Sequence, residues 1–595
     1  MGSCGKAGVL KISLAVLMFS VNSWAAIQVG LSTNLTAPQP VGTPIVWTAT
    51  ASDVNSGTLT YRFSVASSGA PFSIVRDYGY GNTLTWVQSS AEGNYQIQVT
   101  VKNNTTMEAV STVQSFLINP VASASLPIVV SPTGNPLVAL YSTVVCPAGY
   151  AVSVAFQALG DLTAQYTPAQ ICVGTTLNVY IAGMRPNTMY IMTSGIWSGG
   201  VFWPITSAVT FLTGSITGVA LPTITTLSAP PAGSSSRPVL LHSFIGGSFT
   251  DTATDLAGNV IWYYTPPGTG YITQAEPGGK MFVIPFGAND PYLQPLREID
   301  LAGNTILETN AGAVNQQLVA LGAQPITSFH HEARRLQNGN ILVLGSVERM
   351  SPSVQNGADV IGDEIIILSP NLQVLWTWNA FDHLDVNRTA ILGETCTNLA
   401  PGCPPIHLAL VANDWMHSNA ADVGIDGNII LSVRHQDWIV KIDYENGAGT
   451  GAVLWRLGAG GDFTIVSSDP SPWFSHSHGV HWEFGTLGYL SLFDNGNSRH
   501  ATDPTARSRG QLLGIDETNH LAAPILNFDL GVYSPALGYA QILWDGNVLS
   551  AHYEAGDVGG GPLSNAITIY SSGVGTMQSL ANTYRSFLMQ SMYQP

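Results

Sequence analysis

The chain of 595 residues is too long for a single domain, and its length favours two to four domains. Apolar residues make up 45% of the sequence and charged residues only 10%, while 61 glycines and 35 prolines supply many turns. This composition predicts an all-β protein built from hairpins. The formal net charge of −17 excludes a nucleic-acid partner, because such a protein needs a basic surface.

The N-terminus has the layout of a secretory signal peptide. Two lysines precede an apolar run at residues 12–19, and Ser23 and Ala25 occupy the −3 and −1 positions for cleavage after residue 25. A buried first strand is the alternative interpretation. No later apolar run approaches the roughly 20 residues that span a bilayer. We therefore expect residues 1–25 to be removed and the mature protein to be periplasmic or secreted, and not integral to the membrane.

Four cysteines follow the expected cleavage point. An even number in an exported chain favours disulfides over free thiols. The simplest pairing is local, Cys146 with Cys172 and Cys396 with Cys403. No CxxC motif occurs, so we do not expect these cysteines to bind a metal.

Two small β-sandwiches are predicted ahead of the longest region. In residues 26–120, apolar and polar positions alternate between short turns, which is typical of an immunoglobulin-like sandwich. Residues 121–216 show a similar pattern, and residues 184–190 resemble the corner at which a tyrosine fixes the edge of a fibronectin type III domain. A linker rich in Ser, Pro and Gly is predicted at residues 217–238.

From residue 239 onward the sequence becomes repetitive. A Gly-Asn pair precedes an apolar strand at Gly258, Gly303, Gly339, Gly427 and Gly546. The spacing fits the roughly 40–50 residues of a propeller blade. We therefore predict a six-bladed β-propeller over residues 239–595, with five or seven blades as alternatives. The blades, with an insertion at 386–409, are assigned to residues 240–290, 291–328, 329–385, 410–460, 476–530 and 535–590.

Three histidines occupy a similar place in three of these repeats. His331, His417 and His478 each lie ahead of the expected innermost strand of a blade. Because the innermost strands line the central channel, we expect these histidines to meet at one mouth of it. Imidazole acts as acid, base, nucleophile or metal ligand near neutral pH. The planar guanidinium of Arg434, expected nearby, suits sulfate, phosphate or carboxylate oxygens.

Several chemistries compete for such a cluster. Few carboxylates flank the histidines, chiefly Glu332, Asp414 and Asp494, which disfavours a glycosidase mechanism or a hard-metal site. A three-histidine zinc site, in a metal-dependent hydrolase or lyase, is the main alternative, although the charge of Arg434 would oppose a bound dication. A non-enzymatic propeller that binds a glycan or a surface partner is the other alternative, and it would not need the histidines.

The segments around the histidines carry longer motifs. They read HEARRLQNGN, DWMHSNAADV with DGNIILSVRHQDWIVKID, and HGVHW with YLSLFDNGNSR. Together they resemble the bacterial arylsulfate sulfotransferase (ASST) family, and the resemblance covers residues 220–590. It implies an exported six-bladed propeller that moves a sulfuryl group from one phenol to another without a nucleotide donor. The resemblance implies no metal or other cofactor, and it suggests a homodimer.

The resemblance also implies a role for individual residues. His478 matches the nucleophile, which would carry the sulfuryl group as a sulfohistidine in a ping-pong reaction. His331 and His417 match the sulfate-contacting and proton-handling histidines. Asn419 and Arg434 match the ligands of the sulfuryl oxygens.

The motif around the expected nucleophile departs from the family pattern. Ser477 stands where the family usually has a glutamine, and two more histidines lie close by. His476 and His481 are therefore the alternative nucleophiles. His478 is favoured because its distance from the end of the following strand is close to that of His417 from its own.

Overall fold

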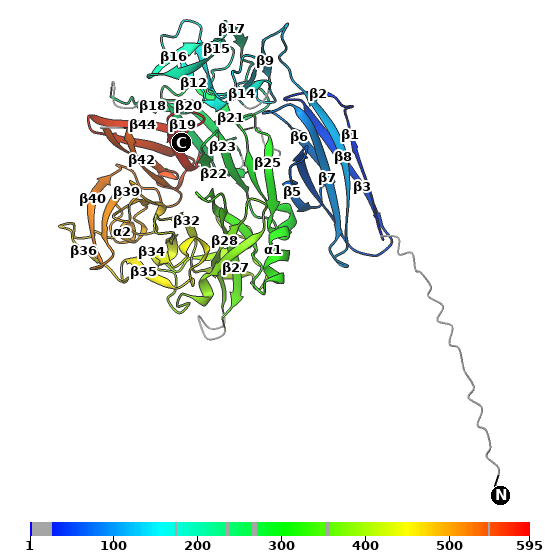
Figure 1. Cartoon of the computed structure of the whole chain (residues 1–595). Helices are drawn as coiled ribbons and strands as arrows, with labels where there is room; N and C mark the ends of the chain where they lie inside the picture. The colour runs from blue at the N-terminus through cyan, green and yellow to red at the C-terminus, as the bar shows by residue number, and fades with distance from the viewer. Residues whose placement is uncertain are drawn as a thin grey trace.

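Strands dominate the computed structural model, with two α-helices, α1 (Ala311–Ala320) and α2 (Asn497–Thr502), among the described residues (Figure 1). The all-β prediction is confirmed. No helix in the described part of the chain is long and apolar enough to cross a membrane. Residues 3–25 of the predicted signal peptide lie outside the described part. The structure describes residues 1–2 and 26–595, apart from 173–174, 232–236, 247, 265–269, 352–357 and 546–547.

Two facing sheets form the first sandwich. Trp47 from one sheet packs edge-on against Phe116 from the other, at 5.5 Å between ring centroids. Alternate residues point inward, which explains the alternation in the sequence. One sheet has the order β1 (Ile27–Thr33), β3 (Pro44–Asp53), β6 (Thr83–Val87). The other has the order β2 (Gln39–Pro40), β8 (Ala109–Asn119), β7 (Gly93–Asn103), β4 (Leu59–Ser67), β5 (Ser73–Gly79). A single parallel pairing of Arg76 with Glu308 joins this sheet to the C-terminal region.

The second sandwich contains the predicted tyrosine corner. The backbone N–H of Arg185 donates to the hydroxyl of Tyr190 at 2.8 Å, and Cys146 is bonded to Cys172 as predicted. One sheet contains β9 (Ile128–Pro132), β10 (Ala139–Thr143) and β14 (Leu177–Ile181). The other contains β11 (Ala151–Ala158), β12 (Gln165–Tyr166), β13 (Gln170–Ile171), β15 (Met189–Ser198), β16 (Val201–Pro204) and β17 (Val209–Leu212).

The remaining described residues form successive antiparallel sets of four strands. The first two sets are β45 (Thr583–Met589), β19 (Val239–Phe244), β20 (Thr252–Asp255), β21 (Val260–Tyr263), and β22 (Gly270–Glu276), β23 (Lys280–Pro285), β24 (Pro295–Ile299), β25 (Thr305–Asn310). The third and fourth are β26 (Ser328–Arg335), β27 (Ile341–Met350), β28 (Asp359–Leu368), β29 (Val374–Asn379), and β32 (Ser418–Val423), β33 (Ile429–Val433), β34 (Trp438–Ile442), β35 (Val453–Gly458). The last two are β37 (His478–Trp482), β38 (Tyr489–Asp494), β39 (Arg509–Asp516), β40 (Leu521–Asp529), and β41 (Tyr539–Asp545), β42 (Val548–Ala555), β43 (Ser564–Tyr570), β44 (Gly573–Ser579).

We call the first strand named in each set its leading strand. The leading strands contact one another in a closed cycle. β45 contacts β22, and the cycle continues through β26, β32, β37 and β41 back to β45. Short strands extend three of the sets: β18 (Ile224–Ser228) pairs with β44, β36 (Thr464–Ile465) with β40, and β31 (Val411–Asp414) with both β28 and β30 (Thr395–Thr397). The two ends of this region are therefore joined by β-pairing.

The predicted Gly-Asn turns form as expected. Gly258, Gly303, Gly339 and Gly427 adopt φ values of 87°, 83°, 85° and 79°, a region in which a Cβ is strained. The turn at Gly546 lies outside the described residues. These turns set the hairpins within each set of strands.

The pairing corrects two expected boundaries. β23 pairs with both β22 and β24, so the expected blades at 240–290 and 291–328 are wrong. The first is split between two sets, and the second holds only the last two strands of its set. The expected linker at 217–238 contains β18, which pairs with the C-terminal β44. Both errors have one cause: these pairings join segments far apart in the chain, and a local sequence pattern carries no record of its distant partner.

A buried polar seam joins the closing strand β45 to its neighbours β42 and β43. The Nε2 atom of His552 lies 2.8 Å from the hydroxyl of Ser586, and that hydroxyl donates to Glu554. The hydroxyls of Ser564 and Thr583 are 2.6 Å apart. Burial raises the pKa of Glu554 to about 7, so this carboxyl keeps its proton inside the seam below that pH.

This seam predicts a pH-dependent contribution to stability. Because the folded-state pKa of Glu554 exceeds its ordinary value of 4.5, the stabilisation is complete below pH 4.5 and is lost as pH rises through about 7. Glu554→Gln removes this dependence. The free energy of unfolding, measured by denaturant at pH 5 and pH 8, should fall less in the variant than in wild type, by up to about 3 kcal/mol. Exposed Glu445→Gln is the control; parallel pH curves for wild type and Glu554→Gln would contradict the assignment.

Candidate active site

The predicted histidines lie close together, and two further histidines extend the cluster. The ring centroids of His331 and His417 are 5.0 Å apart. His435 continues the row, at 4.6 Å from His417 and 5.7 Å from His476. His478 is only 3% exposed. Burial first, and then nearby positive charge, lowers the pKa of His478 well below its ordinary value, so its imidazole is neutral.

The leading strands present these histidines through β-bulges. His331 and His417 have φ values of 53° and 50°, a left-handed conformation that is unusual outside glycine. Each lies at or next to a shift in strand register. In β37 the register shifts between His478 and His481, and Gly479 has the corresponding φ of 59°. His478 therefore sits one residue ahead of the position that His331 and His417 occupy.

Two tyrosines hold the backbone of His331. Its N–H donates to the hydroxyl of Tyr271 at 2.9 Å, and its carbonyl accepts from the hydroxyl of Tyr584 at 2.6 Å. A left-handed residue of this kind costs on the order of 1–3 kcal/mol unless the surroundings fix it. These two hydrogen bonds fix it, and they orient the ring towards His417.

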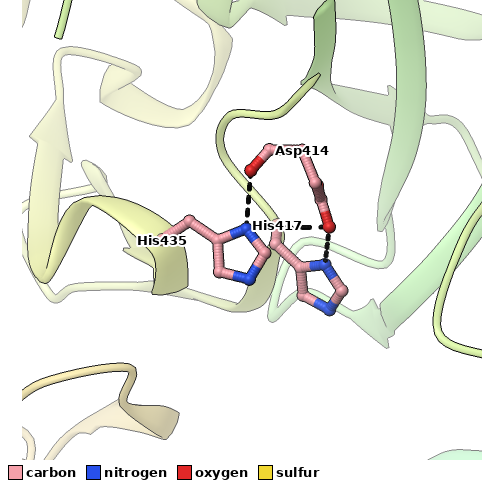
Figure 2. Close-up of side chains that lie close together, drawn as sticks. All are labelled: Asp414, His417 and His435. Carbon is pink, nitrogen blue, oxygen red and sulfur yellow. Dashed lines mark hydrogen bonds and ion pairs between the residues drawn. The ribbon is translucent and has the colours of Figure 1, made fainter. Parts of the chain in front are cut away.

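Asp414 holds both His417 and His435 (Figure 2). The Nδ1 atom of His417 lies 2.6 Å from Asp414 Oδ2. The Nδ1–H of His435 donates to the Asp414 backbone carbonyl at 2.6 Å. On its other side, His435 Nε2 accepts from the guanidinium of Arg434. His435 is thus neutral, in keeping with a pKa that burial lowers well below its ordinary value, and it positions Arg434.

The same three residues are the cluster with metal-ligand potential in the described part of the chain. One ligand atom from each of Asp414, His417 and His435 falls within 4.8 Å of the others. Both nitrogens of His435 already have partners. A guanidinium beside the cluster would repel a dication. The residues therefore fit a metal ion poorly.

The tautomer of His478 is fixed by Asn495. The amide nitrogen of Asn495 donates to two backbone carbonyls, those of Ser534 at 2.8 Å and Leu537 at 2.9 Å. Its Oδ1 must then face His478, whose Nδ1 is 2.6 Å away. An amide oxygen only accepts, so Nδ1 carries the proton and the lone pair is on Nε2. A neutral imidazole with a free lone pair is a nucleophile.

The neighbouring histidines are paired with carboxylates. His476 lies between Glu394 at 2.6 Å and Asp437 at 2.9 Å. Burial opposes its charge, but these two carboxylates raise the pKa of His476 above its ordinary value. His481 faces Asp422, at 3.8 Å. His476 and His481 thus face carboxylates, whereas His478 faces an amide oxygen.

Two guanidinium groups surround the nucleophile candidate. Arg434 is anchored to the carbonyl of Pro535 at 3.0 Å. Arg585 donates to the carbonyl of Asn419 at 2.9 Å and pairs with Glu332 at 3.0 Å. The amide of Asn419 donates to the carbonyl of Ser477, the residue before His478, at 2.7 Å, while its Oδ1 is buried without a partner. The site is thus a buried cluster in which two guanidinium groups lie near a neutral imidazole, and guanidinium groups can bind an anionic ligand.

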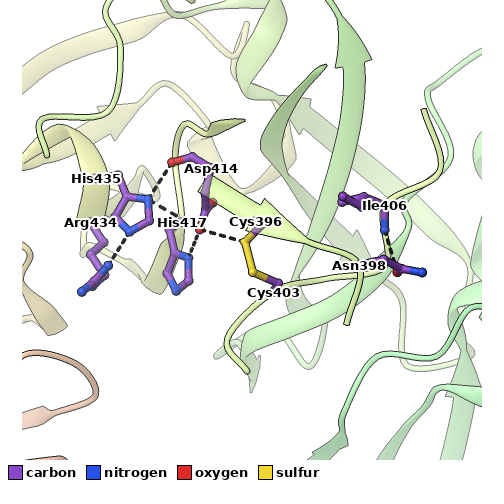
Figure 3. The surroundings of a disulfide bond; sticks show 8 residues. All are labelled: Cys396, Asn398, Cys403, Ile406, Asp414, His417, Arg434 and His435. Carbon is purple, nitrogen blue, oxygen red and sulfur yellow. Dashed lines mark hydrogen bonds and ion pairs between the residues drawn. A yellow bond between two sulfur atoms is a disulfide. The ribbon is translucent and has the colours of Figure 1, made fainter. Parts of the chain in front are cut away.

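The predicted insertion reaches the site through its disulfide (Figure 3). Cys396 is bonded to Cys403, as predicted, and Cys396 Sγ lies 3.5 Å from Asp414 Oδ2. The N–H of Asp414 donates to the carbonyl of Glu394 at 3.0 Å. The insertion therefore supplies the carboxylate of Glu394 and supports that of Asp414.

A family model for arylsulfotransferases (ASST) matches residues 244–579, more than half of the chain. The chain belongs to the arylsulfotransferase family. The resemblance noted in the sequence is thus confirmed, and family membership indicates a sulfotransferase enzyme that acts on small-molecule donors and acceptors. A comparison with curated proteins gave no match.

Two solved structures are similar to part of this arylsulfotransferase-family chain. The FN1–FN3 domains of chicken CNTN1 are 11% identical over 30% of this chain, with a TM-score of 0.13, and the match spans 65% of that chain. A two-domain fibronectin type III segment of chicken tenascin is 14% identical over 31% of this chain and 98% of its own length, with a TM-score of 0.14.

Sequence reasoning missed several residues of the arylsulfotransferase site. His435 and Asn495 stand within the RHQ and DNG motifs, beside residues that were predicted. Searching the neighbours of each motif would have found them. Asp437, directly after the RHQ motif, would have been found in the same way. Asp363 and Glu394 have no such signal, because β28 and the insertion reach the histidines only in the folded chain.

The buried pair Glu332–Arg585 predicts a stability effect. The two side chains are 0% and 1% exposed. Glu332→Gln leaves the charge of Arg585 buried and under-compensated, and should lower the free energy of unfolding by about 3–5 kcal/mol. Denaturant titration measures it. The double variant with Arg585→Met is the control, and it should lose less than Glu332→Gln alone; a loss below about 1 kcal/mol in the single variant would contradict this role.

Proposed function

We propose that this chain transfers a sulfuryl group from an aryl sulfate to a phenol by a ping-pong mechanism through a sulfohistidine at His478. The observation that carries the proposal is the state of His478: buried, neutral, and held by Asn495 with its lone pair on Nε2. The guanidiniums of Arg434 and Arg585 provide the positive potential for an anionic donor. His476 and His481, in contrast, are engaged with carboxylates.

The first half-reaction forms the sulfohistidine. Nε2 of His478 attacks the sulfur of the aryl sulfate, an N–S bond forms, and the S–O bond to the aryl group breaks. The aryl group leaves as a phenolate, which takes its proton from water. Arg434 and Asn419 stabilise the charge on the non-bridging sulfuryl oxygens, as preorganised donors do in other group transfers.

The second half-reaction restores the enzyme. An acceptor phenol gives its proton to His331 or His417, which then releases it to water. The phenol oxygen attacks the sulfur, and the N–S bond to His478 breaks. The net change is exchange of a sulfuryl group for a phenolic proton. The aryl leaving group is good enough that this chemistry needs neither a metal nor a nucleotide.

The proposal includes the architecture around the site. We infer that the six sets of strands are blades of a six-bladed β-propeller at residues 239–595, which the closed cycle of leading strands supports. Residues 26–120 and 121–216 are the immunoglobulin-like and fibronectin III-like domains, and residues 217–223, ahead of β18, connect them to the blades. We also propose that residues 1–25 are cleaved, that the protein is located in the periplasm or outside the cell, and that it forms a homodimer. The two disulfides support export.

The direct test uses 4-nitrophenyl sulfate with a chelator and without a nucleotide donor. Nitrophenol release should require phenol as acceptor and should vanish in His478→Ala. Arg434→Met should lower kcat by about 10²–10³-fold, because one preorganised donor is removed. His520→Ala, at a histidine that stacks on Phe463 outside the cluster, is the matched control and should keep full activity.

Each of the other results of this test would support an alternative hypothesis. Retained activity in His478→Ala would move the nucleophile to His476 or His481. Activity that the chelator abolishes would favour a metal-dependent hydrolase or lyase at Asp414, His417 and His435. A wild type inert with every phenol would favour a binding protein.

The fixed tautomer of His478 gives a second prediction. Asn495→Leu removes the acceptor for Nδ1–H, so the proton is free to move to Nε2 and block the lone pair. kcat should fall between about 10²- and 10⁴-fold, the range seen when a catalytic histidine loses its proton acceptor. Steady-state kinetics measure the loss, and Asn495→Asp, which keeps an acceptor at this position, should retain more activity. Equal losses in the two variants would contradict the tautomer argument.

A further inference from the structure

A sixth histidine, His330, touches the cluster from outside and was not among the expected site residues. Its Nδ1 atom lies 2.9 Å from Nδ1 of His331. Its Nε2 atom lies 3.2 Å from Oδ1 of Asp363, a carboxylate of β28 that is 2% exposed. The three groups form a row from a buried carboxylate to the ring that faces His417, and within it Nε2 of His330 is near Asp363 but has no other hydrogen-bond partner among the described residues.

We propose that Asp363 and His330 form a relay that fixes the proton on His331 and makes His331 the group that exchanges a proton with the phenol. This rests on the proposed function and deepens it. His330 and Asp363 are positioning residues, because they act through His331 rather than on the substrate. The proposal assigns the proton step to His331, which the motifs alone leave shared with His417.

The proton positions follow from the chemistry of the row. Asp363 is a carboxylate, and its pKa is lowered even though burial opposes its charge, because His330 and the N–H of Ser418 stabilise the ionised form. A carboxylate accepts, so the relay places a proton of His330 on Nε2, towards Asp363, and uses its Nδ1 as an acceptor. The Nδ1–H of His331 then donates to it, which leaves the lone pair of His331 on Nε2.

The relay favours protonation of His331, which burial otherwise disfavours. Burial lowers the pKa of His331 well below its ordinary value, and nearby positive charge, including that of Arg585, lowers it further. When the acceptor phenol transfers its O–H proton to Nε2, the positive charge spreads to the Nδ1–H···Nδ1 contact with His330. The carboxylate of Asp363 balances that charge. Tyr271 and Tyr584, which hold the backbone of His331, carry no charge to do so.

Asp363 also ties this relay to the second proton-handling candidate. Its Oδ2 atom accepts from the N–H of Ser418 at 2.6 Å, directly after His417. His417 has its own carboxylate, Asp414, at 2.6 Å. Each histidine thus has a separate carboxylate, and one strand residue, Asp363, fixes the distance between the two.

The test compares His330→Asn and His330→Phe in the full-length protein. The amide oxygen of asparagine takes the place of Nδ1 and still accepts from His331, but it does not reach Asp363; phenylalanine fills the space and does neither. The pH profile of sulfuryl transfer from the sulfo-enzyme to phenol is measured in single-turnover mode. We expect the acidic inflection to move to lower pH and the plateau to fall, by about 10-fold or more in His330→Phe and less in His330→Asn. His383→Phe, where the ring stacks on Trp378, should match wild type.

Two results would overturn the proposal. One is a His330→Phe profile that superposes on wild type. The other is a plateau lowered by a constant factor with an unmoved inflection, which a structural disturbance alone would produce. Thermal unfolding of each variant checks that it folds, and Asp363→Asn, which keeps the shape and removes the charge, must move the inflection in the same direction.

A readout without turnover separates this proposal from the proposed function. In protein with ¹⁵N-labelled histidine, the resonances of His331 are assigned by their loss in His331→Gln. The relay requires the Nδ1–H tautomer in wild type and a changed tautomer or a lowered pKa in His330→Phe. That result, found in a protein without sulfuryl transfer, would refute the function and keep the relay. An Nε2–H tautomer in wild type, in an active enzyme, would refute the relay and keep the function.

Discussion

Pairing of the C-terminal strand β45 with β19 is the contact on which the rest of the catalytic region depends. It closes the cycle of leading strands, and only in a closed cycle do residues from β26, β32 and β37 face one another. The closing strand also contributes to the site directly. Tyr584 holds the backbone of His331, Arg585 anchors Glu332 and Asn419, and Ser586 enters the buried seam with His552. Loss of this strand would therefore remove closure and site support together.

Within the site, the histidines differ in chemical environment because each has different hydrogen-bond partners. An amide oxygen makes His478 a neutral nucleophile candidate, while two carboxylates favour the charged form of His476. His435 is held neutral between a carbonyl and the guanidinium of Arg434. His417 faces its own carboxylate. The low dielectric of the interior amplifies each of these differences, so neighbouring imidazoles a few ångströms apart are held in different chemical environments.

The sequence predicted much of the fold because its signals are local. Alternation of apolar and polar residues marks strands, Gly-Asn pairs such as Gly258 mark hairpins, and the spacing of cysteines marked both disulfides. The errors are all non-local: the strand β18 inside an expected linker, and the sharing of the first expected blade between two sets of strands. A strand's partner is chosen by packing over the whole chain, not by its own pattern.

For the site, the sequence by itself determined the residue types and their repetition: histidines at His331, His417 and His478, and an arginine at Arg434. That was enough to indicate the family, which the match over residues 244–579 established. Only the tertiary structure decided which nitrogen of His478 carries the proton, because that depends on Asn495. Motif spacing records covalent neighbours, whereas protonation is set by through-space hydrogen bonds and burial, which exist only after the chain has folded.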